Sequence, residues 1–207
     1  MKNLYDEDYF ERGVEYKKSC YSNYRWIPEL TIPLAFRMIE YLKIDSEDKI
    51  LDFGCAKGYL VKAFRLLHRK AFGYDISEYA KASVPQDVKE YIVEDYRKEN
   101  FDWIISKDVF EHIPYEEIDE TLINLSGVTK NLFCIIPLGA NGEYVIPAYE
   151  LDSTHIIREN LNWWTEKFLK DNFSVETATY DVKYIKDNWK CWEKGNGFFV
   201  LHSQKNV

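Results

Sequence analysis

The chain of 207 residues is 46% hydrophobic and 30% charged, a composition typical of one globular domain with its own core. A formal net charge of −8 and the absence of clustered lysines and arginines disfavour nucleic acid as a partner, because phosphate binding needs such clusters. No apolar stretch is long enough to cross a membrane and the N-terminus carries no secretory signal, so we expect a cytoplasmic protein without a membrane partner.

The first expected element is a helix that begins near Pro33 and carries Leu34, Met38 and Leu42 on one face. From Ile50 onward, short apolar runs alternate with helical patterns, which is typical of a parallel sheet built from βαβ units. Five strands are expected in this region: 49–53, 71–75, 88–93, 101–106 and 132–136.

Helices are expected between these strands. One follows the first strand, with Leu60, Phe64 and Leu67 on one face, and another opens at Pro114. Ser77 is placed to cap a short helix after the second strand.

The C-terminal part has a different pattern. A helix is expected over 163–170, followed by long strands over 175–185 and 198–202 that are close enough in sequence to pair antiparallel. No repeat or Pro/Gly-rich linker interrupts the chain, so we expect a single domain.

The four cysteines form no CxxC pair and lie far apart in the chain. This spacing predicts free thiols in a reducing compartment and no metal site.

A loop with two glycines, Gly54-Cys-Ala-Lys-Gly58, follows the first strand at once. Such a loop lets a ligand approach the backbone at the carboxyl end of a parallel sheet. Its spacing matches neither the dinucleotide fingerprint G-x-G-x-x-G nor the phosphate-binding loop. Asp52 precedes Gly54 by two residues, where a carboxylate would repel a pyrophosphate and would suit a ligand with a cationic end.

Two further acids follow later strands. Asp75 closes the second strand, roughly 20 residues after Gly54, where an acid can accept hydrogen bonds from ribose hydroxyls. Asp95 follows the third strand and is either a partner of an adenine amino group or a solvated loop acid. These acids therefore favour a ligand with a nucleoside at one end and a cationic amino acid at the other, and S-adenosylmethionine is such a ligand.

Three segments, 50–58, 73–77 and 101–114, resemble the class I S-adenosylmethionine-dependent methyltransferases in register. The resemblance covers residues 30–140. It implies an α/β fold with a Rossmann-like seven-stranded sheet, mostly parallel with the last strand antiparallel, flanked by helices. It also implies S-adenosyl-L-methionine as the cofactor. The family's usual second glycine is Ala56 in this sequence.

By this resemblance, the loop 54–58 would hold the methionine portion, Asp75 the ribose and Asp95 the adenine, with Ser106 and Lys107 beside the amino-acid end. The expected cofactor-binding residues are Asp52, Gly54, Cys55, Ala56, Gly58, Asp75, Ile76, Asp95, Tyr96, Ser106, Lys107 and His112.

The single domain is then expected to have four parts. Residues 1–45 form an N-terminal helical arm or lid, 46–137 the cofactor-binding core, 138–165 an insert on the acceptor side, and 166–207 a C-terminal helix and hairpin. Three arm tyrosines either close over the cofactor or pack the arm onto the domain: Tyr16, Tyr21 and Tyr24.

Methyl transfer from a sulfonium requires alignment of the nucleophile with the methyl group and, for some acceptors, a base. Histidine titrates nearest to neutral pH. His155 is the first candidate because it lies in the long irregular stretch 138–162, near Asp152 and several aromatic residues. The alternative is a histidine that bonds to Asp152 and orders the insert.

The favoured function is methylation of a small-molecule acceptor, such as a sugar or an aromatic metabolite. A protein or RNA acceptor is an alternative, although the acidity disfavours RNA. A catalytically silent S-adenosylmethionine-binding subunit is disfavoured because Asp52, Gly54, Gly58 and Asp75 are all present. An NAD-dependent oxidoreductase is disfavoured by the glycine spacing.

Overall fold

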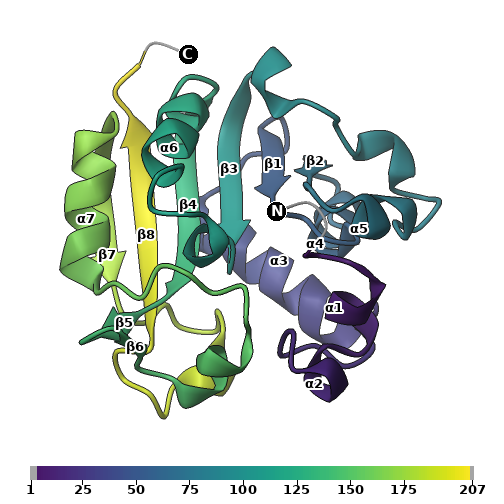
Figure 1. Ribbon diagram of the computed structural model, residues 1–207. Helices are drawn as coiled ribbons and strands as arrows, with labels where there is room; N and C mark the ends of the chain where they lie inside the picture. The colour runs from purple at the N-terminus through teal and green to yellow at the C-terminus, as the bar shows by residue number, and fades with distance from the viewer. Residues whose placement is uncertain (1–3, 206–207) are drawn as a thin grey trace.

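The computed structural model describes residues 4–205, and a sheet of six strands forms its centre (Figure 1). The strands are β1 Lys49–Phe53, β2 Lys70–Tyr74, β3 Phe101–Lys107, β4 Thr129–Pro137, β7 Phe173–Thr179 and β8 Asn196–Ser203. They lie in the order β2-β1-β3-β4-β8-β7. A separate small hairpin consists of β5 Gly139–Ala140 and β6 Glu143–Tyr144.

The expected α/β fold class is confirmed. β1 pairs in parallel with β2 and β3, and β3 pairs in parallel with β4. β8, the last strand, runs antiparallel to both of its neighbours, β4 and β7. The expectation that the last strand is antiparallel, paired with the strand before it, is therefore confirmed.

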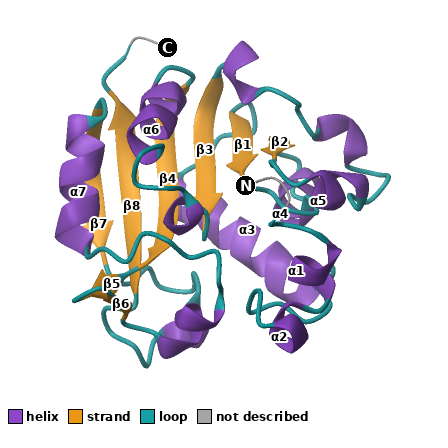
Figure 2. Ribbon diagram, viewed as in Figure 1, coloured by secondary structure: helices purple, strands orange, loops and turns teal. Residues whose placement is uncertain are grey.

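Helices cover both faces of the sheet, as Figure 2 shows by colour. Their bounds are α1 Glu7–Glu11, α2 Gly13–Tyr16, α3 Pro28–Leu42, α4 Tyr59–Leu66, α5 Glu78–Ala82, α6 Ile118–Ser126 and α7 Leu161–Lys170. Short 3₁₀ turns lie at Lys89–Tyr91, Tyr96–Lys98, Phe110–His112, Pro147–Leu151 and Asp187–Trp189.

Alternating residues of the central strands contribute to two cores. Leu51 and Ile104 belong to the core under α6 and α7, whereas Ile50 and Ile105 belong to the core against α3 and α4. Strands buried on both faces appear in the sequence as continuous apolar runs. This explains why the pattern located β1 and β3 correctly.

The prediction of seven strands is wrong, because the expected strand at 88–93 does not form. Lys89–Tyr91 is a 3₁₀ turn, and the segment reaches the sheet only through one parallel bridge between Gly73 and Ile92. The charged pair Lys89 and Glu90 faces solvent, so the segment lacks the alternation that a strand at the sheet edge needs.

Three other boundaries differ from expectation. The helix expected near Pro33 begins at Pro28, and the helix expected at Pro114 is regular only from Ile118. The strand expected to reach residue 185 ends at Thr179. Beyond it the chain turns back at an isolated antiparallel bridge instead of extending the ladder.

The carboxyl ends of β1, β3 and β4 point to the edge of the sheet where the N-terminal helices and the β5–β6 hairpin lie (Figure 1). Segments 4–27 and 138–160, far apart in the sequence, meet there: Ser153 donates backbone and hydroxyl hydrogen bonds to the carbonyl of Lys18. In the described part of the chain, no helix is long and apolar enough to cross a membrane.

Candidate active site

The loop after β1 adopts a left-handed backbone at Gly54, Ala56 and Gly58, with φ of 82°, 48° and 71°. Left-handed φ favours glycine, and at Gly54 a side chain would also clash with Val109. The amides of Gly54 and Cys55 both donate to the carbonyl of the last β2 residue. The loop therefore turns sharply at the carboxyl end of the sheet, and Gly54 and Ala56 face the cavity described below.

Asp75 follows β2 and lies beside this loop. One carboxylate oxygen accepts from the amide of Ala56 and the other from the amide of Ser77, each at 2.7 Å. Burial raises the pKa of Asp75, although both hydrogen bonds oppose that shift. Because a carboxylate offers about four acceptor positions, Asp75 retains room for further donors.

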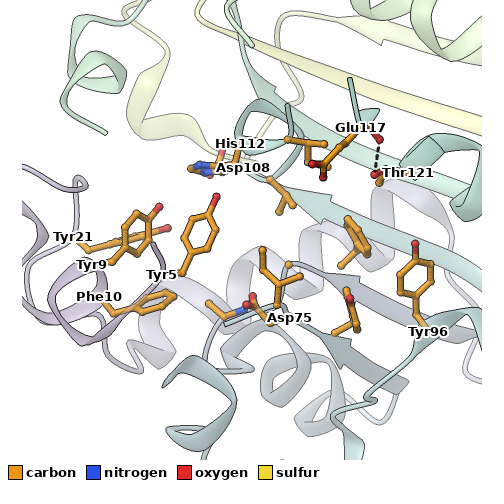
Figure 3. A pocket seen from close by; sticks show the side chains of 17 residues that line it. Tyr5, Tyr9, Phe10, Tyr21, Asp75, Tyr96, Asp108, His112, Glu117 and Thr121 are labelled. Carbon is orange, nitrogen blue, oxygen red and sulfur yellow. Dashed lines mark hydrogen bonds between the residues drawn. The ribbon is translucent and has the colours of Figure 1, made fainter. Parts of the chain in front are cut away.

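A cavity of about 240 Å³ opens between this loop and the segment after β3 (Figure 3). Six of the expected cofactor-binding residues line it: Gly54, Ala56, Asp75, Ile76, Tyr96 and His112. The other six do not: Asp52, Cys55, Gly58, Asp95, Ser106 and Lys107. The structure thus brings half of the expected set to one cavity, and the cofactor roles of all twelve stay predictions.

Asp52 is 4% exposed, at the position before the last residue of β1. Burial, together with the nearby charge of Asp75 and against the effect of Lys107, raises the pKa of Asp52 to about 7. Cys55 and Gly58 shape the loop, and the amide of Gly58 donates to the carbonyl of Cys55 at 2.8 Å.

Asp95 caps the 3₁₀ turn that follows it. Its carboxylate accepts from the amide of Arg97 at 3.2 Å and pairs with the guanidinium of Arg97 at 2.8 Å. The neighbouring Tyr96 lines the cavity instead. Ser106 is buried in β3, and Lys107 pairs with Asp108 at 2.5 Å.

The N-terminal segment covers one side of the cavity. Tyr5, Tyr9, Phe10 and Tyr21 line it, and Figure 3 shows Tyr5 between Asp75 and His112. The hydroxyl of Ser77 donates to the carbonyl of Tyr5 at 2.6 Å.

Of the three tyrosines expected either to close over the cofactor or to pack the arm onto the domain, only Tyr21 lines this cavity. Tyr24 packs behind it, with ring centroids 4.8 Å apart, and Tyr16 is 49% exposed. Sequence reasoning missed Tyr5 and Tyr9. Tyr5 precedes the N-cap of α1 and Tyr9 lies within the helix, so the available signal was only the crowding of aromatic residues near the N-terminus.

His112 lines the cavity, whereas His155 does not. His155 is 8% exposed and packs on His112 with a centroid distance of 4.6 Å. Its Nε2 lies 4.0 Å from Asp152, too far for a hydrogen bond; Asp152 accepts from the Tyr9 hydroxyl at 2.9 Å instead. Burial lowers the pKa of His155, and a catalytic role for it stays a prediction.

No curated protein sequence matches this chain. The family model described as a methyltransferase domain matches residues 30–168.

Three solved structures share the fold. Magnesium protoporphyrin IX methyltransferase from Synechocystis PCC 6803, with bound S-adenosylhomocysteine, is 14% identical and covers 98% of this chain and 100% of its own, with a TM-score of 0.66. An S-adenosylmethionine-dependent methyltransferase from Clostridium acetobutylicum is 9% identical over 84% and 92%, with a TM-score of 0.61. The glycopeptide N-methyltransferase MtfA is 10% identical over 84% and 96%, with a TM-score of 0.60.

The family match spans well over half of the chain, and it includes both the glycine loop and the segment after β3 that form the cavity. The chain therefore belongs to the methyltransferase domain family, as a class I S-adenosylmethionine-dependent methyltransferase.

Proposed function

We propose that this enzyme methylates a small molecule, such as a sugar or an aromatic metabolite, and not a nucleic acid or a protein. The observation that carries the proposal is the covering of the cavity by the N-terminal segment. Tyr5 packs edge-on against His112 with centroids 5.8 Å apart, and the backbone of Tyr5 is held by Ser77. A cavity covered in this way favours an acceptor that fits inside it.

The cofactor would occupy the side of the cavity formed by Gly54, Asp75 and Tyr96. Asp75 would accept from the ribose hydroxyls, Tyr96 would contact the adenine, and Asp52 below the loop would offset the charge of the ammonium. The acceptor would then enter on the side of Asp108 and His112, because both line the same cavity.

Two properties support this choice of acceptor. The net charge of −8 opposes a polyanion. The wall formed by Tyr5, Tyr9 and Tyr21 offers flat apolar faces with polar hydroxyl tips, which suit ring-shaped ligands. Both properties favour an uncharged or cationic ring compound that reaches the cavity by small motions of the segment.

The proposal can be tested with methyl-labelled S-adenosylmethionine and a cell extract separated into an ultrafiltrate, a protein fraction and an RNA fraction. We expect label in a compound of the ultrafiltrate that chromatography separates from S-adenosylmethionine, and much less of it with Asp75→Ala. Label in RNA or protein would contradict the proposed acceptor. Cofactor binding without transfer to any fraction would instead support a silent binding subunit.

A further inference from the structure

Three side chains with metal-binding atoms converge next to the cavity: Glu111, His112 and His155. Nε2 of His112 lies 4.0 Å from Oε1 of Glu111, and Nε2 of His155 lies 3.9 Å from the same oxygen. One ligating atom from each residue falls within 4.8 Å of the other two. The first two residues follow β3, whereas His155 comes from the insert, so folding alone brings them together.

Glu111 is fully buried, and neither of its carboxylate oxygens has a hydrogen-bond partner among residues 4–205. Nδ1 of His155 likewise has none within the described chain. Buried polar groups are almost always paired, so these atoms need a partner that the described side chains do not supply.

The hydrogen bonds of His112 fix which of its ring nitrogens can bind a cation. The hydroxyl of Thr154 donates to Asp152 at 2.6 Å, so its oxygen must accept the bond from Nδ1 of His112 at 2.8 Å. The proton of the neutral ring is then on Nδ1, and Nε2 presents a lone pair toward Glu111. Metal-binding histidines typically have this arrangement, with the second nitrogen bonded to an outer partner.

We propose that Glu111, His112 and His155 bind a divalent transition-metal ion, with zinc as the expected one. Two imidazoles and one carboxylate are a common ligand set for zinc, and they leave a fourth position open. Magnesium and calcium prefer oxygen ligands throughout. Donor atoms about 2.0–2.2 Å from a tetrahedral zinc ion lie about 3.3–3.6 Å apart. The 3.9 and 4.0 Å to Oε1 of Glu111 would therefore shorten by a few tenths of an ångström on binding, and all three donors already lie within 4.8 Å of one another.

This site goes beyond the proposed function and departs from the sequence-based expectation of no metal, which considered cysteine spacing alone. Because His112 also lines the cavity, a metal ion here would lie next to the space assigned to the acceptor. An acceptor that carries an oxygen or nitrogen donor atom could bind the metal ion at its fourth coordination position.

The test uses the full chain without cofactor or acceptor, stripped with a chelator and titrated with Zn²⁺ by calorimetry, and with Co²⁺ by visible absorption. We expect the protein to bind one equivalent of Zn²⁺. The Co²⁺-loaded protein should show the d–d absorption bands of a four- or five-coordinate site with nitrogen and oxygen ligands. Glu111→Gln and His155→Asn should weaken Zn²⁺ binding at least about 100-fold, and Thr154→Val by about 10–100-fold. His202→Asn, which alters an exposed histidine 2.6 Å from Glu176, is the matched control and should bind normally.

Glu111→Gln keeps the size and shape of the buried side chain, so it should fold and melt near the temperature of the metal-free wild type. Zn²⁺ should raise the melting temperature of the wild type and leave that of Glu111→Gln unchanged. A wild type that binds no stoichiometric Zn²⁺ or Co²⁺ would overturn the proposal, as would variants that all bind as tightly as His202→Asn. Because no methyl transfer is measured, this result is independent of the acceptor assay.

Discussion

The ammonium of Lys57 in the glycine loop pairs with the carboxylate of Glu11 in α1, and the lysine side chain is only 8% exposed. Lys57 also donates to the carbonyl of Tyr24 at 2.9 Å, and the hydroxyl of Tyr79 donates to the same carboxylate at 2.9 Å. The segment that covers the cavity is thus bonded directly to the loop that would hold the cofactor.

Glu11→Gln should loosen this segment by about 1–3 kcal/mol, because it removes a charge-assisted bond from a buried ammonium. We expect faster proteolysis within residues 4–25 and faster dissociation of S-adenosylmethionine. Limited proteolysis and stopped-flow binding would measure both. Asp87→Asn, which breaks the pair of an exposed aspartate with Lys62, should change neither. Equal behaviour of the two variants would mean that the buried pair does not hold the segment closed.

Asp75→Ala should weaken cofactor binding by about 1.5–3 kcal/mol, the loss expected for hydrogen bonds to a charged acceptor. The structure adds a second effect, because Ala56 and Ser77 also lose the acceptor of their amides. The melting temperature should therefore fall as well. Calorimetric titration and thermal unfolding separate the two effects. A folded variant with unchanged affinity would remove Asp75 from the cofactor site.

The stability of the cofactor-free enzyme should depend on Asp52. The folded state raises the pKa of this carboxyl from 3.8 to about 7, mainly through burial. The folded state therefore binds the proton more tightly than the unfolded chain, and this contribution to stability is lost as pH rises from about 4 to about 7. Relative to Asp52→Asn, the wild type should lose up to about 1.4 kcal/mol per pH unit in that window. Denaturant unfolding of both proteins across the window would measure it; parallel curves would contradict the prediction.

The sequence located the glycine loop at the cavity because its signal is local. A buried strand, two glycines and Asp75 at the next strand end are all readable from spacing, and the structure places Gly54 and Asp75 on one cavity. Asp95 shows where local reading stops, because its side chain caps a 3₁₀ turn with Arg97 while Tyr96 faces the cavity. Which of two adjacent residues faces a ligand depends on turn geometry that composition does not encode.

Contacts between distant segments were the least predictable. Tyr9 and Asp152 are 143 positions apart in sequence, yet they form a buried hydrogen bond. No periodicity links them, since Tyr9 lies in the short helix α1 and Asp152 in the irregular stretch after β6. The strand expected at 88–93 does not form for a similar reason. Its apolar residues predict burial, but whether the neighbouring strand offers a full ladder of hydrogen bonds depends on the fold, and only one bridge forms there.

Two substitutions in the loop should change stability by different amounts. Gly54→Ala places a side chain at φ 82° and against Val109, so we expect a loss of at least about 1–2 kcal/mol of stability and weaker cofactor binding. Ala56→Gly relieves a left-handed alanine at φ 48°, and the greater freedom of glycine in the unfolded chain offsets that gain to within about 1 kcal/mol. Unfolding and binding measurements on both variants test this; equal losses would contradict the assigned loop geometry.

The last prediction concerns the two histidines next to the cavity. His112 lines it and packs on Tyr5, whereas His155 contacts His112 and has Tyr144 and Tyr149 around its ring, with centroids 5.1 and 5.8 Å away. His112→Ala should therefore weaken S-adenosylmethionine binding, because it removes part of the cavity wall.

His155→Ala should leave cofactor binding near normal and lower turnover by about 10²–10⁴-fold, the range for loss of a general base. If His155 binds the proposed metal ion, its lone pair cannot accept a proton, and the same fall in turnover then reports the loss of that ion. The measurement is kcat and KM for the acceptor beside the dissociation constant of S-adenosylmethionine for each variant. A fall in kcat with unchanged cofactor affinity assigns His155 to the chemistry, either directly or through His112. If His155→Ala keeps nearly full turnover, alignment of the acceptor alone drives the transfer, and His155 serves to order the insert around Tyr144 and Tyr149.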